Sequence, residues 1–316
     1  MRFIFFLCLF GAVPLCSAEE AVVFAQEKAD TIEIRHGEQI VLVYHKKEVS
    51  PPDGADPIFR RSGFIHPVKT PSGAEVTGIH PDDHFHHTGL WHGWVHGSFD
   101  DRPFDSWNLA KGLGRVRYAE TLSVEDGGFS VEQEHLQVHE GEVSVVLREK
   151  FEIRARLVEG AYEIDYDVSQ TNVGAHELRF PPFRYGGPIA YRSPPTWRVA
   201  NSDYLSSEGK TRVDGHATRA RWCSMWGPDS RAPAKTVSLT IMGHDVNFDA
   251  PQRLRLWSAG NHGGALFFNF VPRQEKELLF KPSQTHSFRY RIVVADQRPD
   301  SAKLERRWTR YIARQP

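Results

Sequence analysis

Apolar and polar residues alternate in several short segments of this chain. The alternation is clearest at residues 31–34, 143–147, 162–168, 237–241 and 288–294. A period of two is typical of strands with one buried face, because successive side chains of a strand point to opposite sides. Turn residues such as Asp126-Gly127-Gly128 separate neighbouring segments, which favours antiparallel hairpins. An unbroken apolar run at residues 40–44 suits a strand that is covered on both faces.

A helical period is present at the C-terminal end. One helical face carries the apolar residues Leu304, Trp308, Tyr311 and Ile312. Asp300 or Ser301 can cap the first turn, and we expect the helix to pack on the edge of a sheet. No repeat or long linker divides the chain. The sequence therefore predicts a mostly β fold, a single large antiparallel β-sandwich over residues 19–316 with long loops and a C-terminal helix.

The N-terminus has the composition of a signal peptide. Arg2 is followed by an apolar run to residue 15 and then by Cys16-Ser17-Ala18. A charged start, a short apolar core and a small-residue cleavage site are the three parts of such a signal. The run is too short to span a bilayer comfortably. We expect residues 1–18 to be removed after Ala18, and the mature protein to be periplasmic or secreted.

The charge of the chain excludes some classes of partner. There are 39 basic and 40 acidic side chains, which give a formal net charge of -1. No basic run or basic helix appears, so nucleic acid and anionic membranes are poor partners on electrostatic grounds. A small molecule or an oligosaccharide is the expected partner, with no membrane contact after the signal is cleaved.

The densest group of chemically active side chains lies at residues 80–96, which hold six of the 16 histidines. Histidine exchanges protons near neutral pH and is the commonest metal ligand, so such a cluster raises both acid–base catalysis and metal binding. If the segment is extended, His84 and His86 project to one face and His87 to the other. Asp83 lies beside them, and Asp82 or Asp83 could serve as one catalytic carboxylate.

A structural explanation competes with the functional one. Any single histidine of this segment can be explained as a brace that bonds to the backbone of its own loop. The whole cluster is harder to explain in that way, because so many buried polar groups are costly unless they are used. The candidate catalytic residues are His84, His86, His87, Asp83 and His66.

Arginine and aromatic residues supply the candidate ligand-binding groups. Flat rings can cover the apolar faces of a sugar, and guanidinium groups can hold hydroxyls or a carboxylate. Phe183-Arg184-Tyr185-Gly186-Gly187 places a cation and a ring beside two flexible positions. The candidate substrate-binding residues are Arg61, Trp91, Trp94, Arg184, Tyr185, His244 and Asn247.

Several familiar catalytic motifs are absent from the sequence. It contains no G-x-S-x-G, Walker loop, dinucleotide fingerprint, H-E-x-x-H or C-x-x-C. Serine hydrolase, NTPase, dinucleotide-dependent dehydrogenase and zincin activities therefore lose support.

Three motifs resemble those of a known family. They are Arg61-x-Gly63-Phe64-Ile65-His66-Pro67, then Asp83-His84-x-His86-His87-x-Gly89-Leu90-Trp91, then His244-x-x-Asn247 before Pro251 and Trp257. The chain is similar over most of its mature length to exported bacterial proteins of unknown function that carry the label PmoA. That label implies a methane monooxygenase subunit, which is an integral membrane protein, whereas the mature chain has no stretch of about 20 apolar residues. We reject the oxygenase activity.

The same resemblance implies a fold similar to the galactose-mutarotase-like supersandwich and a place among polysaccharide-degradation proteins. The leading hypothesis is an exported carbohydrate-active enzyme, an epimerase, lyase or hydrolase, in which His84, His86 or His87 moves a proton on a sugar or sugar acid. A noncatalytic carbohydrate-binding protein is the second hypothesis. The third is a divalent-metal site formed by His84, His86 and either His66 or Asp83. No organic cofactor is expected.

Overall fold

Two eight-stranded antiparallel sheets form the body of the protein in a computed structural model that describes residues 23–313. In order across the first sheet the strands are β1 (Val23–Glu27), β2 (Thr31–His36), β3 (Gln39–His45), β4 (Phe64–Val68), β5 (Leu90–Gly93), β13 (Gly187–Arg192), β18 (Phe267–Val271) and β17 (Arg253–Leu256). In the second sheet they are β14 (Asp203–Ser206), β15 (Trp222–Asp229), β16 (Ala232–Gly243), β20 (Thr285–Ala295), β11 (Ala161–Asn172), β10 (Glu142–Val158), β9 (Gly128–His139) and β8 (Gly114–Glu125).

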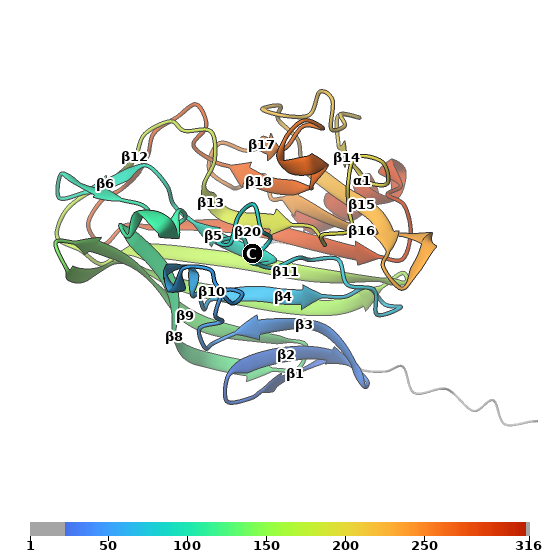
Figure 1. Ribbon diagram of the computed structural model, residues 1–316, viewed down its shortest axis with the longest axis horizontal. Helices are drawn as coiled ribbons and strands as arrows, with labels where there is room; N and C mark the ends of the chain where they lie inside the picture. Colours follow the sequence, from blue (N-terminus) through green and yellow to red (C-terminus); the bar gives the residue numbers. More distant parts are fainter. Residues whose placement is uncertain (1–22, 314–316) are drawn as a thin grey trace, which may run out of the picture.

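A smaller sheet and four helical segments complete the described fold. The small sheet has the order β19 (Leu278–Phe280), β12 (Leu178–Phe180), β6 (Gly97–Phe99) and β7 (Arg102–Phe104). The helical segments are the short 3-10 turns η1 (Pro57–Phe59), η2 (Leu109–Lys111) and η3 (His262–Gly264) and the α-helix α1 (Ser301–Ile312). Figure 1 shows the first sheet lying across the long strands β8 to β11 of the second. The predicted antiparallel β-sandwich is confirmed.

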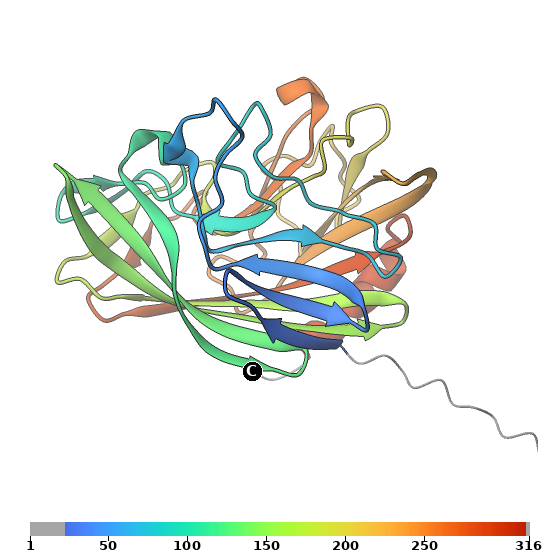
Figure 2. The same cartoon turned by 60° about the horizontal axis from the view of Figure 1, so that its bottom comes forward.

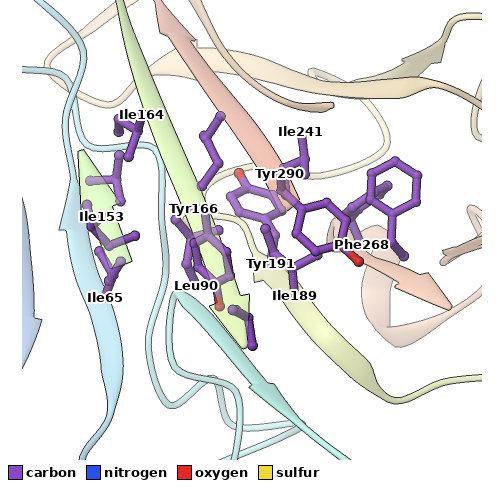
Figure 3. Packing of buried hydrophobic residues seen from close by; sticks show 14 of the residues in the cluster. Ile65, Leu90, Ile153, Ile164, Tyr166, Ile189, Tyr191, Ile241, Phe268 and Tyr290 are labelled. Carbon is purple, nitrogen blue, oxygen red and sulfur yellow. The ribbon is translucent and has the colours of Figure 1, made fainter. Parts of the chain in front are cut away.

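The main core fills the space between the two large sheets. Ile65, Leu90 and Tyr191 point inward from the first sheet, and Ile153 and Tyr166 meet them from the second (Figure 3). The alternation in the sequence explains this arrangement, because buried and partly exposed residues alternate along most of β11. The strand register also aligns large core side chains, since Tyr166 lies opposite Tyr290 of β20 and opposite Ile153 of β10.

The predicted C-terminal helix is also present. The side chain of Asp300 accepts a hydrogen bond from the amide of Lys303, which caps the first turn. Leu304 and Tyr311 are buried against the outer face of the second sheet, in a cluster that contains Trp222. The helix therefore covers a sheet face, as well as lying near its edge.

One sequence prediction lies outside the described residues. The predicted signal peptide, residues 1–18, lies before the first described residue. In residues 23–313, no helix is both long and apolar enough to cross a lipid bilayer.

Candidate functional site

The histidine-rich loop before β5 consists of two consecutive turns. The amide of His84 donates to the carbonyl of Pro81 at 2.8 Å, and the amide of His87 donates to the carbonyl of His84 at 2.9 Å. Pro81-Asp82-Asp83 is a sequence that favours such a turn. The extended geometry considered from the sequence is therefore not the one formed. The second turn instead stacks the rings of His84 and His87, with centroids 4.6 Å apart.

Both ends of this loop are fixed to strand β13. The amide of Gly78 donates to the carbonyl of Arg192 at 2.9 Å, and the amide of Arg192 donates to the carbonyl of Gly89, also at 2.9 Å. Gly89 has φ +70, and a Cβ atom there would lie 2.4 Å from the carbonyl oxygen of Ile65. Only glycine fits this exit from the loop, so the backbone holds the histidines in place.

The loop forms one wall of a cavity of about 290 Å³, here named the histidine pocket. Figure 2 shows the segments that contribute to it rising on one side of the first sheet, including the cyan loop before β5 and the orange segment around η3. Its lining residues are His84, His86, His87, Trp107, Asn108, Arg184, Tyr185, Arg255, Trp257, His262 and Phe267. Segments far apart in the sequence therefore meet here, and no aspartate or glutamate is among these lining residues.

His86 is the partly exposed histidine of the pocket whose ring nitrogens have no protein partner within residues 23–313; the buried His87 has none either. In the described part of the chain its side chain has no hydrogen bond and no ion pair, and its ring lies 5.4 Å from that of His84 and 4.6 Å from that of His87. Burial, together with the neighbouring His84 and Arg61, lowers the pKa of His86 to about 3. The imidazole is therefore neutral at physiological pH and, without a nearby anion, a weak base.

His87 has a different environment. It is 2% exposed, and its ring stacks on Phe267 with centroids 5.0 Å apart and contacts Trp91 at 4.6 Å. Burial lowers its pKa well below the usual histidine value. A neutral ring packed in this way orients its neighbours more than it contacts a ligand.

A second group of side chains joins His84 to the other wall of the pocket. Asp83 Oδ2 lies 3.4 Å from His84 Nδ1 and 3.6 Å from His262 Nδ1, while Asp83 Oδ1 accepts a hydrogen bond from Arg192 at 2.7 Å. Trp257 packs against His262 at 4.0 Å and under the guanidinium of Arg192 at 4.7 Å. Although burial opposes it, the contacts with His84 and Arg192 hold the pKa of Asp83 below its usual value. Asp83 is therefore a carboxylate that fixes two imidazoles.

The opposite wall of the histidine pocket carries two arginines and a polar pair. Arg184 and Arg255 both line the pocket, and neither forms an ion pair within residues 23–313. Burial and the nearby Arg184 lower the pKa of Arg255. Asn108 and Tyr185 bond to each other at 3.2 to 3.3 Å, and Asp105 holds Asn108 in place at 2.9 Å. This wall can bind an anion and hydroxyl groups.

Two predicted substrate-binding tryptophans are placed in the interior. Trp91 and Trp94 are both 0% exposed. Trp91 lies behind the pocket wall, against His87, and Trp94 lies in the main core, where its Nε1 donates to Gln170 at 2.9 Å. Neither lines the histidine pocket, because Trp91 packs in a second apolar cluster with Trp107 and Phe267 and Trp94 packs between the sheets.

Arg61 is also separated from the pocket that its sequence position suggested. It is 2% exposed, donates to the carbonyl of His92 and faces the interior polar groups. His66 lies on β4, where its Nδ1 is 3.0 Å from Thr77 Oγ1 and where burial and His45 lower its pKa to about 4. The structure thus brings Arg184 together with His84, His86 and His87, but it does not place Arg61 or His66 on the same lining.

His244 and Asn247 line a different cavity, next to α1. His244 Nδ1 lies 2.8 Å from Asp245, and Asn247 bonds in both directions to the backbone of Arg289, at 2.7 and 2.8 Å. That cavity of about 260 Å³ is bordered by Trp308 and does not include any residue of the histidine pocket. The side chain of Asn247 is committed to the fold.

One histidine of the cluster points the other way, into the core. His92 of β5 is 1% exposed, and its Nε2 lies 2.9 Å from Glu149 Oε2. The same oxygen lies 2.9 Å from His135 Nε2 and accepts a hydrogen bond from Gln170 at 2.7 Å. Although burial alone would raise the pKa of Glu149, His92 and His135 hold it below its usual value. For His92 the structural explanation fits, because its partners complete a buried network.

Among the residues that the structure describes, two groups of side chains could hold a metal ion. One is Asp83, His84 and His262, and the other is the buried set His92, His135 and Glu149. Donor atoms around a tetrahedral ion with bonds of about 2.1 Å are about 3.4 Å apart, so the first group fits in spacing. His262, and not His66 or His86, supplies its second imidazole. The charge of the Asp83, His84 and His262 group suits a metal cation less well than its spacing does, because Arg192 already neutralises Asp83.

Sequence analysis missed several lining residues of the site. Arg255 lies on β17, Trp257 and His262 arrive from the β17–β18 connection, and Trp107 and Asn108 arrive from the segment before η2. The sequence signal was present only for the group around residues 257–262, where a tryptophan, an asparagine and a histidine lie close together. Nothing in the alternation pattern indicates which loop faces which.

Comparisons with known proteins identify a family and several distant structures. Residues 31–309 match the model described as "Family of unknown function (DUF6807)". A search of the curated proteins found no match. Since that description assigns no function, the resemblance to PmoA-labelled proteins stays a prediction.

Similar solved structures include three carbohydrate-related proteins. A galactose mutarotase related enzyme from Lactobacillus acidophilus has a TM-score of 0.41 at 8% identity, over 88% of this chain and 100% of that chain. A heparan sulfate lyase from Pedobacter heparinus has a TM-score of 0.39 at 9% identity, over 88% of this chain and 37% of that one. A polysaccharide lyase has a TM-score of 0.36 at 11% identity, over 88% and 33%. The chain spans about a third of the length of these two lyases, and the likeness concerns the fold alone.

Proposed function

The chain belongs to the family of unknown function DUF6807, and we propose that it is an exported carbohydrate-active enzyme in which His86 moves a proton on a sugar bound in the histidine pocket. One observation carries this proposal. Among residues 23–313, His86 has no protein partner for either ring nitrogen and, unlike the buried His87, is partly exposed in a pocket walled by Trp107, Tyr185 and Trp257. Neutral imidazole is a proton acceptor, and aromatic walls suit the apolar face of a sugar ring.

The neighbouring side chains fit supporting roles in proton transfer. His87 packs behind His86 and restricts its ring, whereas His84 is tied to Asp83 at 3.4 Å and supplies a second imidazole on the same wall. A ligand carboxylate would raise the pKa of His86 by electrostatic attraction, so the base would gain strength when substrate binds. Asn108 and Tyr185 are positioned to bond to sugar hydroxyls.

The residues that line the histidine pocket also favour some reaction types over others. Ordinary glycoside hydrolysis uses two carboxyl groups on either side of the scissile bond. The residues that line the histidine pocket include no aspartate or glutamate, and Asp83 behind His84 is bonded to Arg192. Epimerisation and elimination, which both begin by removing a proton from carbon, are better supported.

Deuterium exchange tests this proposal directly. The protein would be incubated in D₂O with a panel of neutral and acidic oligosaccharides, and deuterium on carbon would be read by mass spectrometry. We expect exchange with at least one sugar, and a loss of about 10²–10⁴ in its rate in His86→Ala. The exposed His176 provides a matched control, because His176→Ala lies outside the pocket. If no sugar that binds gives either deuterium on carbon or an unsaturated elimination product, the enzyme is rejected and a noncatalytic binding protein is favoured.

A divalent-metal site is the second candidate function, and the spacing of Asp83, His84 and His262 favours it. Elemental analysis of protein purified without chelators, followed by titration with Zn²⁺, tests this candidate. Stoichiometric metal that is lost in His262→Ala would support it. Protein without metal that still catalyses exchange would exclude it.

A further inference from the structure

The two arginines of the histidine pocket differ from most arginines on this surface. Elsewhere a guanidinium group usually holds carboxylates: Arg219 pairs with Asp249 and Glu275, at 2.8 and 3.0 Å. Arg184 and Arg255 have no such partner in the described residues. Two adjacent cations without a counter-charge repel each other, which is a cost that an anionic ligand would remove.

The surroundings of these arginines direct them to the pocket. Arg184 lies 5.7 Å above the ring of Tyr185, and Arg255 Nη1 lies 3.2 Å from His216 Nε2. Both contacts leave most of the guanidinium donors unused. A planar carboxylate accepts paired N–H groups from such forks, which is a geometry that neutral hydroxyls do not match.

We propose that the sugar in this pocket is a uronic acid whose carboxylate is bound by Arg184 and Arg255. This inference rests on the proposed function and specifies its substrate. The aromatic wall, with Trp107 at 1% and Trp257 at 4% exposure, is rigid enough to fix the ring of that sugar between the cations and the histidines.

A carboxylate at this position determines the reaction that His86 can perform. The hydrogen on the carbon next to the carboxylate is acidic. When that C–H bond breaks, His86 takes the proton and the electron pair moves into the carboxylate, which becomes a dianion. The two guanidinium groups stabilise the additional charge. Delivery of a proton to the opposite face by a water molecule gives the epimer, and the imidazolium of His86 returns its proton to the resulting hydroxide through solvent.

Elimination continues from the same intermediate. The electron pair forms a C=C bond as the neighbouring C–O bond breaks, and the leaving oxygen takes the proton from the imidazolium. No oxidant, reductant or other co-reactant is needed. The products are an unsaturated uronate and an alcohol.

Paired oligosaccharides test this inference. Defined-length oligomers of galacturonate, mannuronate and glucuronate–hexosamine would be compared with the same oligomers after reduction of their carboxyl groups. Binding would be measured by calorimetry, using the wild type, Arg184→Gln, Arg255→Gln and the control Arg306→Gln. Arg306 is exposed on α1 and lines no part of the histidine pocket. Melting temperatures would confirm that every variant folds.

We expect the wild type to bind at least one uronate oligomer about 10–100-fold more tightly than its reduced form. Either pocket variant should remove most of that preference and leave binding of the reduced sugar unchanged, while Arg306→Gln behaves as wild type. Equal affinity for the acidic and reduced forms, or a preference that survives both variants, would overturn the inference.

The outcomes distinguish this inference from the proposed function. A carboxylate preference without deuterium exchange and without an unsaturated product supports the binding role of the arginines and rejects the proton transfer. Deuterium exchange on neutral sugars without any carboxylate preference supports the proton transfer and rejects the binding role of the arginines. Tighter binding of sulfated neutral oligomers or of an oligonucleotide would assign a different anion and overturn the uronic acid.

Discussion

Replacing the core carboxylate Glu149 with glutamine is expected to destabilise the fold while leaving the histidine pocket in place. Glu149 is 0% exposed, and one of its oxygens lies within 2.9 Å of His92 and His135. These side chains join the inner faces of the two large sheets. The variant therefore tests the structural role of His92 independently of the histidines that face the pocket.

The magnitude follows from the charge that remains after the substitution. Glu149 is the carboxylate that acts on Arg61, which is 2% exposed. In Glu149→Gln the buried group of His92 and His135 loses its carboxylate and Arg61 loses a negative charge that acts on it, and losing one partner of a buried charged group costs about 3–5 kcal/mol. For a chain of this length, 1 kcal/mol lowers the melting temperature by roughly 2 °C. The variant should therefore melt about 6–10 °C below the wild type.

The assay is urea unfolding and thermal melting followed by circular dichroism. Glu152 on the same strand, β10, is a matched control, because its side chain is 45% exposed and pairs with Lys150. Glu152→Gln should change stability by no more than about 0.5 kcal/mol. Adding Arg61→Met to Glu149→Gln removes the unpaired cation and should restore part of the loss. A loss below about 1 kcal/mol in Glu149→Gln would refute the reasoning, since it is less than breaking a buried pair should cost.

Four further predictions concern the pocket, the second sheet and the N-terminus. His86→Ala should abolish exchange on the bound sugar with a melting temperature close to that of the wild type; full activity with a lowered melting temperature would instead assign His86 a structural role. Burial and the neighbouring Asp165 raise the pKa of Asp167 to about 6, so the folded state loses stability as pH rises from about 4 to about 6. Asp167→Asn should raise the free energy of unfolding by about 1–2 kcal/mol above pH 7, with little gain near pH 4, and an equal gain at both would contradict this. Prolonged dialysis against a chelator should leave the uronate preference of the wild type unchanged, as measured by calorimetry. N-terminal sequencing of exported protein should begin at Glu19, and a start far from that residue would reject the predicted signal peptide.

The architecture could be predicted because it depends on local patterns. Alternation at residues 162–168 and 288–294 places one face of β11 and of β20 in the core, and the helical period near Trp308 identifies α1. These signals concern which side of an element is buried, and neighbouring residues are enough to read them.

The site was predictable only in part, because convergence of loops is not a local property. The density of histidines identified one wall correctly, but the two turns that stack His84 on His87 replace the alternation expected of a strand. Trp94 was assigned to ligand binding because it lies near those histidines in sequence, yet its position directly after β5 places it in the core. Arg255 and His262 carry no sequence signal that pairs them with a loop about 170 residues earlier.

The attachment of the histidine loop to β13 has a consequence for engineering. The amides of Gly78 and Arg192 fix both loop ends on a central strand of the first sheet, whereas the lining residues before η2 and around η3 come from segments that join separate strands. Libraries that randomise positions 108, 184 and 255 would therefore alter substrate selectivity without disturbing the frame that holds His86. Transplanting residues 78–89 alone onto another scaffold would not transfer the site, because the frame and the opposite wall would remain behind.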